Sequence, residues 1–108
     1  MKKPRKLVRE MHGGEEYAYY PLGKYIVACP EVCGGRPTFK YTRVEAAFVL
    51  GLLSTGDSVD RIVANHEGRI PREAILEAFD LAGQSLEAQA VREFKARPRS
   101  LPRRAKVR

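Results

Sequence analysis

Five basic side chains in the middle of the sequence could hold the phosphates or base edges of a nucleic acid: Lys40, Arg43, Arg61, Arg69 and Arg72. Arginine can donate two parallel hydrogen bonds to guanine or to a phosphate, whereas lysine supplies a point charge. Acidic residues at positions 67, 73, 77 and 80 oppose this role, because they would repel a DNA duplex. The alternative interpretation is a solvated helix face of mixed charge.

The end of the chain carries a second set of candidate binding residues: Arg97, Arg99, Leu101, Arg103, Arg104, Lys106 and Arg108. Such a segment could anchor on nucleic-acid phosphates, with binding that weakens steeply as salt rises. It could instead order over an acidic pocket of a protein partner, where arginine pairs with carboxylates and Leu101 and Val107 serve as apolar anchors. A solvated tail that only aids solubility is the third interpretation.

Both ends of the chain are basic and its middle is acidic. Twelve of the 20 Lys and Arg residues lie in the first nine and last fourteen residues, and all 13 acidic residues lie between Glu10 and Glu93. Charge confined to the ends favours arms that fold onto an acidic partner over a uniformly basic groove. We therefore expect a basic, flexible N-terminal arm over residues 1–14, a folded domain over residues 15–94, and a basic C-terminal arm over residues 95–108.

Metal binding and catalysis are both disfavoured by the residue spacing. Cys29 and Cys33, with the distant His12 and His66, lack the close ligand pairs of a structural zinc site, and a disulfide would be unusual in a reducing cytoplasm. Two thiols flanking a turn are the simpler interpretation. No nucleophile lies at a spacing that couples it to a base, so we expect a protein that is not an enzyme and has no cofactor. His66 is expected to contact carbonyl groups at a helix end.

The size of the chain and its hydropathy set further expectations. No run approaches the roughly 20 apolar residues that cross a bilayer, and the basic N-terminus lacks the apolar stretch of a signal peptide. We therefore expect a soluble, cytoplasmic protein that does not contact a membrane. A single core in about 80 residues is only modestly stabilising, which makes a homodimer a reasonable expectation, with strands near the N-terminus available for pairing.

The first half of the sequence has the pattern of short strands. Residues 15–20 and 25–29 are rich in aromatic and β-branched residues and are separated by a turn sequence with proline and glycine, which favours a hairpin. Residues 38–44 form a third extended segment.

One arginine precedes this third segment, beside two glycines, and another lies within it. Arg36 and Arg43 are expected to pair with Glu31 or Glu45 and so to fix the junction between the last strand and the first helix.

From Val44 onward the apolar residues recur at spacings of three and four, which predicts helices over residues 44–55, 58–66 and 71–82. Ser58 can cap the second helix, and Pro71 suits the first turn of the third.

Two apolar stripes follow in the second half. The third helix should bury four residues and end at Gly83: Ile75, Ala78, Phe79 and Ala82. A fourth helix, capped by Ser85, should place four apolar residues on one side: Leu86, Ala90, Val91 and Phe94. The pair formed by the second and third helices has the outline of a helix-turn-helix unit, although similar pairs also occur in proteins that never touch DNA.

Residues 25–44, YIVACPEVCGGRPTFKYTRV, resemble the opening of domain-of-unknown-function family 433, in which a PxVCGGxPxIxGTR string precedes the helices. Residues 49–62, VLGLLSTGDSVDRI, are similar to its VLxLLxxGxSVEEI segment, and residues 75–82 are similar to its closing helix. Together these segments cover roughly half of the chain. The sequence departs from the family pattern at Tyr41, where the family usually has glycine, and at Pro71, where it usually has a hydroxyl or acidic cap.

The resemblance implies a mainly α fold: a three- to four-helix, homeodomain-like helix-turn-helix unit preceded by two or three short β-strands. For characterised members it also implies a role as a VapB-type antitoxin of a type II toxin–antitoxin pair, with a PIN-like ribonuclease as partner. We therefore expect an antitoxin-like regulator that binds operator DNA as a homodimer and silences a PIN-like ribonuclease with its C-terminal arm. The alternatives are a nucleic-acid-associated accessory protein bound through its basic arms, and a protein-interaction module without nucleic-acid binding.

Overall fold

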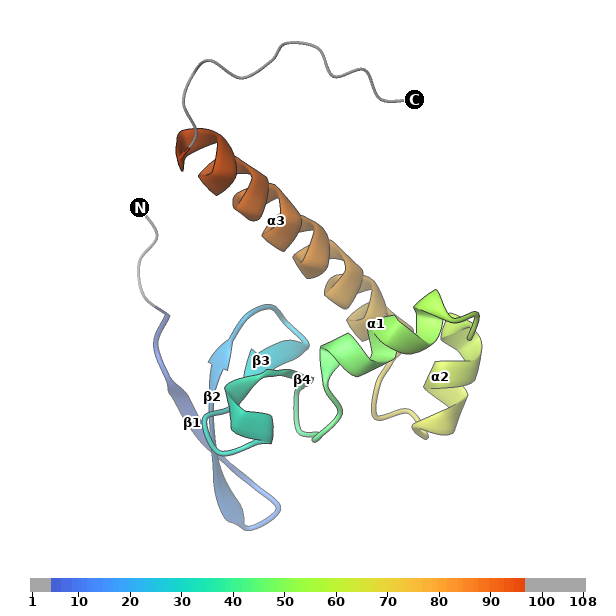
Figure 1. The fold of residues 1–108 in the computed structure, drawn as a ribbon. Coiled ribbons are helices and arrows are strands. Elements are labelled where there is room, and N and C mark those ends of the chain that lie inside the picture. The colour runs from blue at the N-terminus through green and yellow to red at the C-terminus, as the bar shows by residue number, and fades with distance from the viewer. Residues whose placement is uncertain (1–4, 97–108) are drawn as a thin grey trace.

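The computed structural model describes residues 5–96, which form a four-stranded antiparallel sheet and three α-helices (Figure 1). The strands, in their order across the sheet, are β1 (Val8–His12), β2 (Glu15–Pro21), β3 (Ile26–Ala28) and β4 (Pro37–Phe39). A short 3-10 turn (Cys33–Gly35) precedes β4, and the helices are α1 (Ala46–Ser54), α2 (Val59–Asn65) and α3 (Arg72–Ala96). The prediction of a mainly α fold with short leading strands is wrong, because the first half of the described chain is a complete antiparallel sheet.

Residues 8–12 form strand β1, within the range for which a flexible arm was expected. β1 pairs with β2 along its whole length. Gly13 and Gly14, with φ of 62° and 83°, make the two-residue turn between the strands, a conformation in which both central residues need a positive φ. The predicted domain therefore begins earlier than residue 15.

Basic residues at this end are held against the sheet. Arg5 Nη1 donates a hydrogen bond to the carbonyl of Pro21 at 3.0 Å, and Arg9 Nη1 lies 3.1 Å from Glu16 Oε2. The charge of these residues suggested an arm, but alternate side chains of an edge strand face solvent and are often charged. Arg5 and Arg9 are therefore part of the folded domain.

β3 separates two apolar clusters, because neighbouring residues of a strand point to opposite faces of the sheet. Ile26 packs with Phe39 in the main core, on the face covered by the helices. Val27 packs with Tyr19 and Cys29 on the other face. The hairpin predicted for residues 15–29 is confirmed, since β2 and β3 pair antiparallel.

The helices and the turn between α2 and α3 complete the main core with seven buried residues, of which Ile70 lies in the turn: Ala46, Val49, Ile62, Ile70, Ala74, Ile75 and Ala78. The predicted ends of α2 are confirmed. The Ser58 hydroxyl accepts the N–H of Arg61 at 3.0 Å, and Nδ1 of His66 lies 2.9 Å from the carbonyl oxygen of Ile62 at the other end.

α3 is one continuous helix of 25 residues, whereas two helices separated at Gly83 were predicted. Glycine in a helix costs about 1 kcal/mol relative to alanine, which good helix formers on both sides can offset. A hydrogen bond of 2.9 Å from Gln84 to Asp80 also spans this position. Phe79, expected in the buried stripe, is 47% exposed. In the part of the chain that the structure describes, no helix has the length and apolar character that crossing a membrane requires.

Candidate functional site

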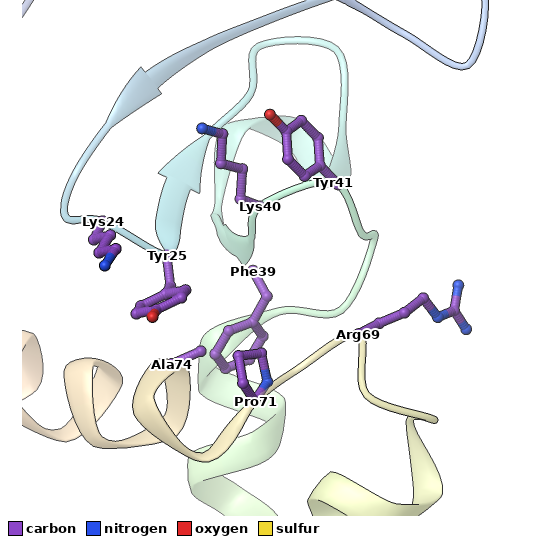
Figure 2. Close-up of a pocket in the computed structure, with 8 residues that line it drawn as sticks. All are labelled: Lys24, Tyr25, Phe39, Lys40, Tyr41, Arg69, Pro71 and Ala74. Atoms are coloured by element: carbon purple, nitrogen blue, oxygen red, sulfur yellow. The ribbon is translucent and has the colours of Figure 1, made fainter.

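Two of the predicted nucleic-acid contacts, Lys40 and Arg69, lie at one pocket although they are far apart in the sequence. The pocket has a volume of about 370 Å³ and lies where the sheet meets the turn between α2 and α3 (Figure 2). Eight residues line it: Lys24, Tyr25, Phe39, Lys40, Tyr41, Arg69, Pro71 and Ala74. Three of these lining residues are cations and none is acidic.

The pocket has an apolar floor and a mixed aromatic and cationic rim. Figure 2 shows Phe39 beside Pro71 at its base, and Phe39 is only 1% exposed. Tyr25 and Tyr41 lie on two sides of the opening, while the guanidinium of Arg69 extends outward from the floor. Aromatic rings can stack on a planar base, and nearby cations can bind the phosphate attached to it.

Glu77 of α3 anchors the loop that carries Lys24 and Tyr25. Its carboxylate accepts the backbone N–H groups of Lys24 at 2.8 Å, Tyr25 at 2.7 Å and Ile26 at 3.0 Å. Gly23 lies so close that a Cβ there would come within 2.6 Å of the same carboxylate. The sequence suggested only that Glu77 would repel a DNA duplex. The feature of the sequence that could have indicated its anchoring role is a carboxylate close to the apolar stripe of a helix.

The opposite rim is held by side chains from β1, β2 and the turn after β4. Glu10 Oε1 accepts the Tyr41 hydroxyl at 2.6 Å, and Glu10 Oε2 accepts the Tyr19 hydroxyl at 2.5 Å. Lys40 Nζ lies 3.8 Å from Glu10 Oε2, and 4.9 Å and 5.0 Å from the ring centroids of Tyr19 and Tyr41. One carboxylate and two aromatic rings thus place the ammonium group of Lys40.

The backbone turns sharply at Tyr41, which has a φ of 68°. This left-handed conformation costs a non-glycine residue roughly 1–2 kcal/mol. Two contacts offset that cost: the Tyr41 N–H donates to the Tyr17 hydroxyl at 2.8 Å, and the Tyr41 ring stacks on His12 with centroids 4.3 Å apart. The extended segment predicted for residues 38–44 is therefore wrong beyond Phe39, where β4 ends.

The pKa of Glu10 is lowered from 4.5, first because Tyr19 donates a hydrogen bond to the carboxylate and next because Tyr41 does. The folded state therefore favours the ionised carboxylate, and this contribution to stability is present above pH 4.5 and is lost as the pH falls through the folded-state pKa. We expect an NMR titration of the Glu10 carboxyl to give a pKa below 4.5, and Tyr19→Phe to raise it more than Tyr41→Phe. An unchanged pKa of Glu10 in Tyr19→Phe would contradict this account.

The other three predicted contacts do not line this pocket. Arg61 Nη1 lies 3.3 Å from Asp57 Oδ1, and Arg72 Nη1 lies 3.0 Å from Asp60 Oδ1. Arg43 is exposed and makes no ion pair with another described residue. The structure thus brings together two of the five predicted residues and adds Lys24, Tyr25 and Tyr41, which were not predicted: none of the three has a local pattern that marks it as a binding residue.

Of the two arginines expected to pair with Glu31 or Glu45, Arg36 does so. Its Nε and Nη2 each lie 3.1 Å from one carboxylate oxygen of Glu45, and this fork raises the pKa of Arg36. Arg43 contributes through its backbone instead, because its carbonyl accepts the Cys33 thiol at 3.4 Å. Arg36 therefore joins the segment before β4 to the start of α1, as predicted.

A comparison with protein-family models matches residues 26–82 to the family described as "Protein of unknown function (DUF433)". The chain belongs to this family. No curated protein and no solved structure matches it. The DUF433 segment runs from β3 into α3.

Most residues that line the pocket belong to the DUF433 segment, whereas one residue that holds them in place does not. Phe39, Lys40 and Arg69 fall inside residues 26–82, but Glu10, which holds Lys40 and Tyr41, comes from β1 outside it. Tyr41 keeps its sharp turn through contacts with Tyr17 and His12 of the N-terminal hairpin, which lies outside the matched residues.

The structure describes both cysteines but not the predicted partner-binding residues of the C-terminal arm. Cys29 is buried and Cys33 is half-buried, and both are free thiols beside a turn. Within residues 5–96, no three potential metal ligands come together. The predicted partner-binding residues lie outside the described residues: Arg97, Arg99, Leu101, Arg103, Arg104, Lys106 and Arg108.

Proposed function

We propose that this DUF433 protein is a non-enzymatic, cytoplasmic regulator of the antitoxin kind, which binds operator DNA and neutralises a PIN-like ribonuclease. The observation that carries the DNA-binding half is the gathering of Lys24, Lys40 and Arg69 around one opening whose lining holds no carboxylate. The ribonuclease half is supported by the antitoxin role that the resemblance to this family implies and by the basic sequence that follows α3.

Buried neighbours hold the backbone of Lys40 and of Arg69 in place relative to each other. Lys40 follows Phe39 and Arg69 precedes Ile70, and these two neighbours are 1% and 0% exposed in the same core. A preformed arrangement loses less conformational entropy when a phosphate binds. The pKa of Lys40 is raised, first by its hydrogen bond with Tyr19, so its ammonium group stays charged at neutral pH.

In this proposal α2 and the first turn of α3 lie against the duplex beside the pocket. Arg61 and Arg72 are held by Asp57 and Asp60 in ion pairs at the protein surface. Surface pairs of this kind are worth about 0–1 kcal/mol, so a DNA phosphate can replace the carboxylate at little cost. These arginines then add sequence-independent contacts around the pocket.

Two variants of the full-length chain separate the two halves of the proposal. Arg69→Ala should weaken binding to a duplex from the region upstream of its own gene by about 10-fold, and lower the slope of log K against log salt by about 1. It should leave inhibition of a PIN-like ribonuclease encoded beside it unchanged. Replacing both Arg103 and Arg104 with glutamine should weaken inhibition of the ribonuclease and leave DNA binding unchanged. Fluorescence anisotropy measures the DNA binding, and RNA cleavage measures the inhibition.

Arg92→Ala is the matched control, because it removes one exposed cation from α3 outside the pocket. Its DNA affinity should stay within about twofold of the unmodified chain. Equal losses in Arg69→Ala and Arg92→Ala would show that net charge governs binding and would overturn the pocket as the DNA contact. Binding through basic arms alone is less well supported, because Arg5 and Arg9 contact the sheet.

A further inference from the structure

The second half of α3 has no cover within the described chain. Residues 83–95 are all exposed, and Figure 1 shows this part of the helix running beyond α1 and α2. An isolated helix shorter than about 12–15 residues is marginally stable in water, because most helical stability comes from packing of an apolar face. This half of α3 would therefore be stabilised by a second surface packed against it.

An apolar stripe runs along nearly the whole of α3. Its large members are Leu76, Phe79, Leu86 and Phe94, which are 49%, 47%, 66% and 70% exposed. They follow spacings of three, seven and eight residues, which place them on one side of a helix. In the first half, this side differs from the one that buries Ala74 and Ala78, so an occupant of the stripe need not displace the core.

Small residues fill the gaps in the stripe. Gly83 lies between Phe79 and Leu86, and Ala90 lies between Leu86 and Phe94. Apart from its chain neighbours and the nearby backbone of α3, no described atom lies within 4 Å of the place where a Cβ at Gly83 would stand. The stripe therefore alternates between bulky side chains and places where another helix can approach closely.

We propose that the occupant of this stripe is the α3 of a second copy, packed antiparallel about an axis near Gln84 and Ser85. In this register Phe79 faces the partner's Ala90 and Leu86 faces the partner's Gly83, so the two central bulky residues meet small ones, and near each end Leu76 packs beside the partner's Phe94. The axis falls near the midpoint of α3, which lets two helices of roughly 37 Å overlap along their full length.

The self-complementarity argues for a second copy over an unrelated protein. In a two-fold dimer the stripe must fit a second copy of itself that runs in the opposite direction. An unrelated partner places no such requirement on the order of large and small residues. A parallel pair would set Phe79 against Phe79 and Gly83 against Gly83, which gives overcrowding in one layer and a void in another. The inference does not depend on DNA binding or on a ribonuclease.

One feature of the proposed dimer is unfavourable and can be tested. Asp80 and Glu87 flank the stripe on the same side, and the antiparallel register brings Asp80 close to the partner's Glu87 between two packed layers. Like charges at such positions destabilise a helix pair. Glu87→Lys should therefore tighten the dimer about fivefold, and Glu31→Lys, the same charge change on an exposed loop, should not.

Sedimentation equilibrium of the full-length chain tests the surface itself. The unmodified chain should be dimeric at tens of micromolar, and Phe79→Asp should weaken the dimer at least ~100-fold. Phe48→Asp is the matched control, because Phe48 is an exposed phenylalanine on α1, and it should leave the dimer intact. Both sites are exposed, so circular dichroism should show a folded chain in each variant.

A swap of large and small residues tests the register. Phe79→Ala should leave a void and Ala90→Phe should crowd the interface, whereas the double variant should recover most of the affinity of the unmodified dimer. A monomer at all concentrations, equal losses in Phe79→Asp and Phe48→Asp, or no recovery in the double variant would overturn the proposal. So would a monomeric chain whose ribonuclease inhibition is abolished by Phe79→Asp, because the stripe would then serve that protein.

Discussion

Replacing Glu77 with alanine is expected to lower the free energy of unfolding by about 3 kcal/mol. The substitution removes the acceptor of three backbone N–H groups, at Lys24, Tyr25 and Ile26. Tyr25 is half-buried and Ile26 is buried, so water cannot fully replace the lost acceptor there. In a domain of this size the thermal midpoint, followed by circular dichroism, should fall by roughly 12 °C or more.

Two further variants test whether the hydrogen bonds cause this loss. Glu77→Gln keeps one carbonyl oxygen, and Oε1 alone accepts from both Tyr25 and Ile26, so it should cost about half as much. Glu73→Ala removes an exposed carboxylate from the first turn of α3 and should cost about 0.5 kcal/mol. A loss in Glu73→Ala as large as that in Glu77→Ala would show that charge, and not the anchoring of the loop, is responsible.

Phe39→Ala is expected to cost about 4 kcal/mol of unfolding free energy. Phe39 is 1% exposed and packs in the main core while forming the floor of the pocket, so its removal leaves a cavity between the sheet and α3. Small domains have total stabilities of about 5–15 kcal/mol, so this loss takes much of what is available. Urea unfolding monitored by circular dichroism measures it directly.

Phe48→Ala provides the comparison, because it deletes the same atoms from a side chain that is 58% exposed. It should cost less than about 1 kcal/mol. Comparable losses at the two positions would contradict the assignment of Phe39 to the core.

Elements with strong local signals could be predicted from the sequence. The β2–β3 hairpin has two runs of aromatic and β-branched residues on either side of a proline–glycine turn. α2 begins after a serine cap and ends at His66, and both features act within one turn of the helix. Such signals depend on residues that are neighbours in the chain, so they act in the same way whatever the tertiary structure around them.

The two ends of the domain were mispredicted for opposite reasons. The strand β1 was not predicted, because the basic charge of the N-terminal residues suggested a flexible arm. Gly13 and Gly14 are nevertheless typical of a two-residue hairpin turn. α3 was divided because Gly83 was read as a stop, although one glycine among helix formers costs only about 1 kcal/mol. Strand pairing outweighs the basic charge at one end of the domain, and the helix formers around Gly83 outweigh the cost of the glycine at the other.

The candidate site could be predicted in part. Lys40 and Arg69 were chosen as cations near a helix pair, and both line the pocket. The groups that place the pocket residues act over long distances in the sequence: Glu77 reaches back to Lys24, and Glu10 reaches forward to Tyr41. No periodicity or spacing encodes such contacts, because each depends on how the sheet and α3 meet.

The anchoring of the β2–β3 loop by Glu77 also bears on synthesis. These hydrogen bonds join residues that are 51 to 53 positions apart in the sequence. While the start of α3 is still inside the ribosome, the loop between β2 and β3 therefore has no acceptor for its N–H groups. Domains fold during translation as their segments leave the ribosome, and contacts between distant segments form last. A ribosome-bound fragment that stops before α3 would therefore lack the acceptor that anchors this loop, and the pocket can assemble only after the start of α3 has left the ribosome.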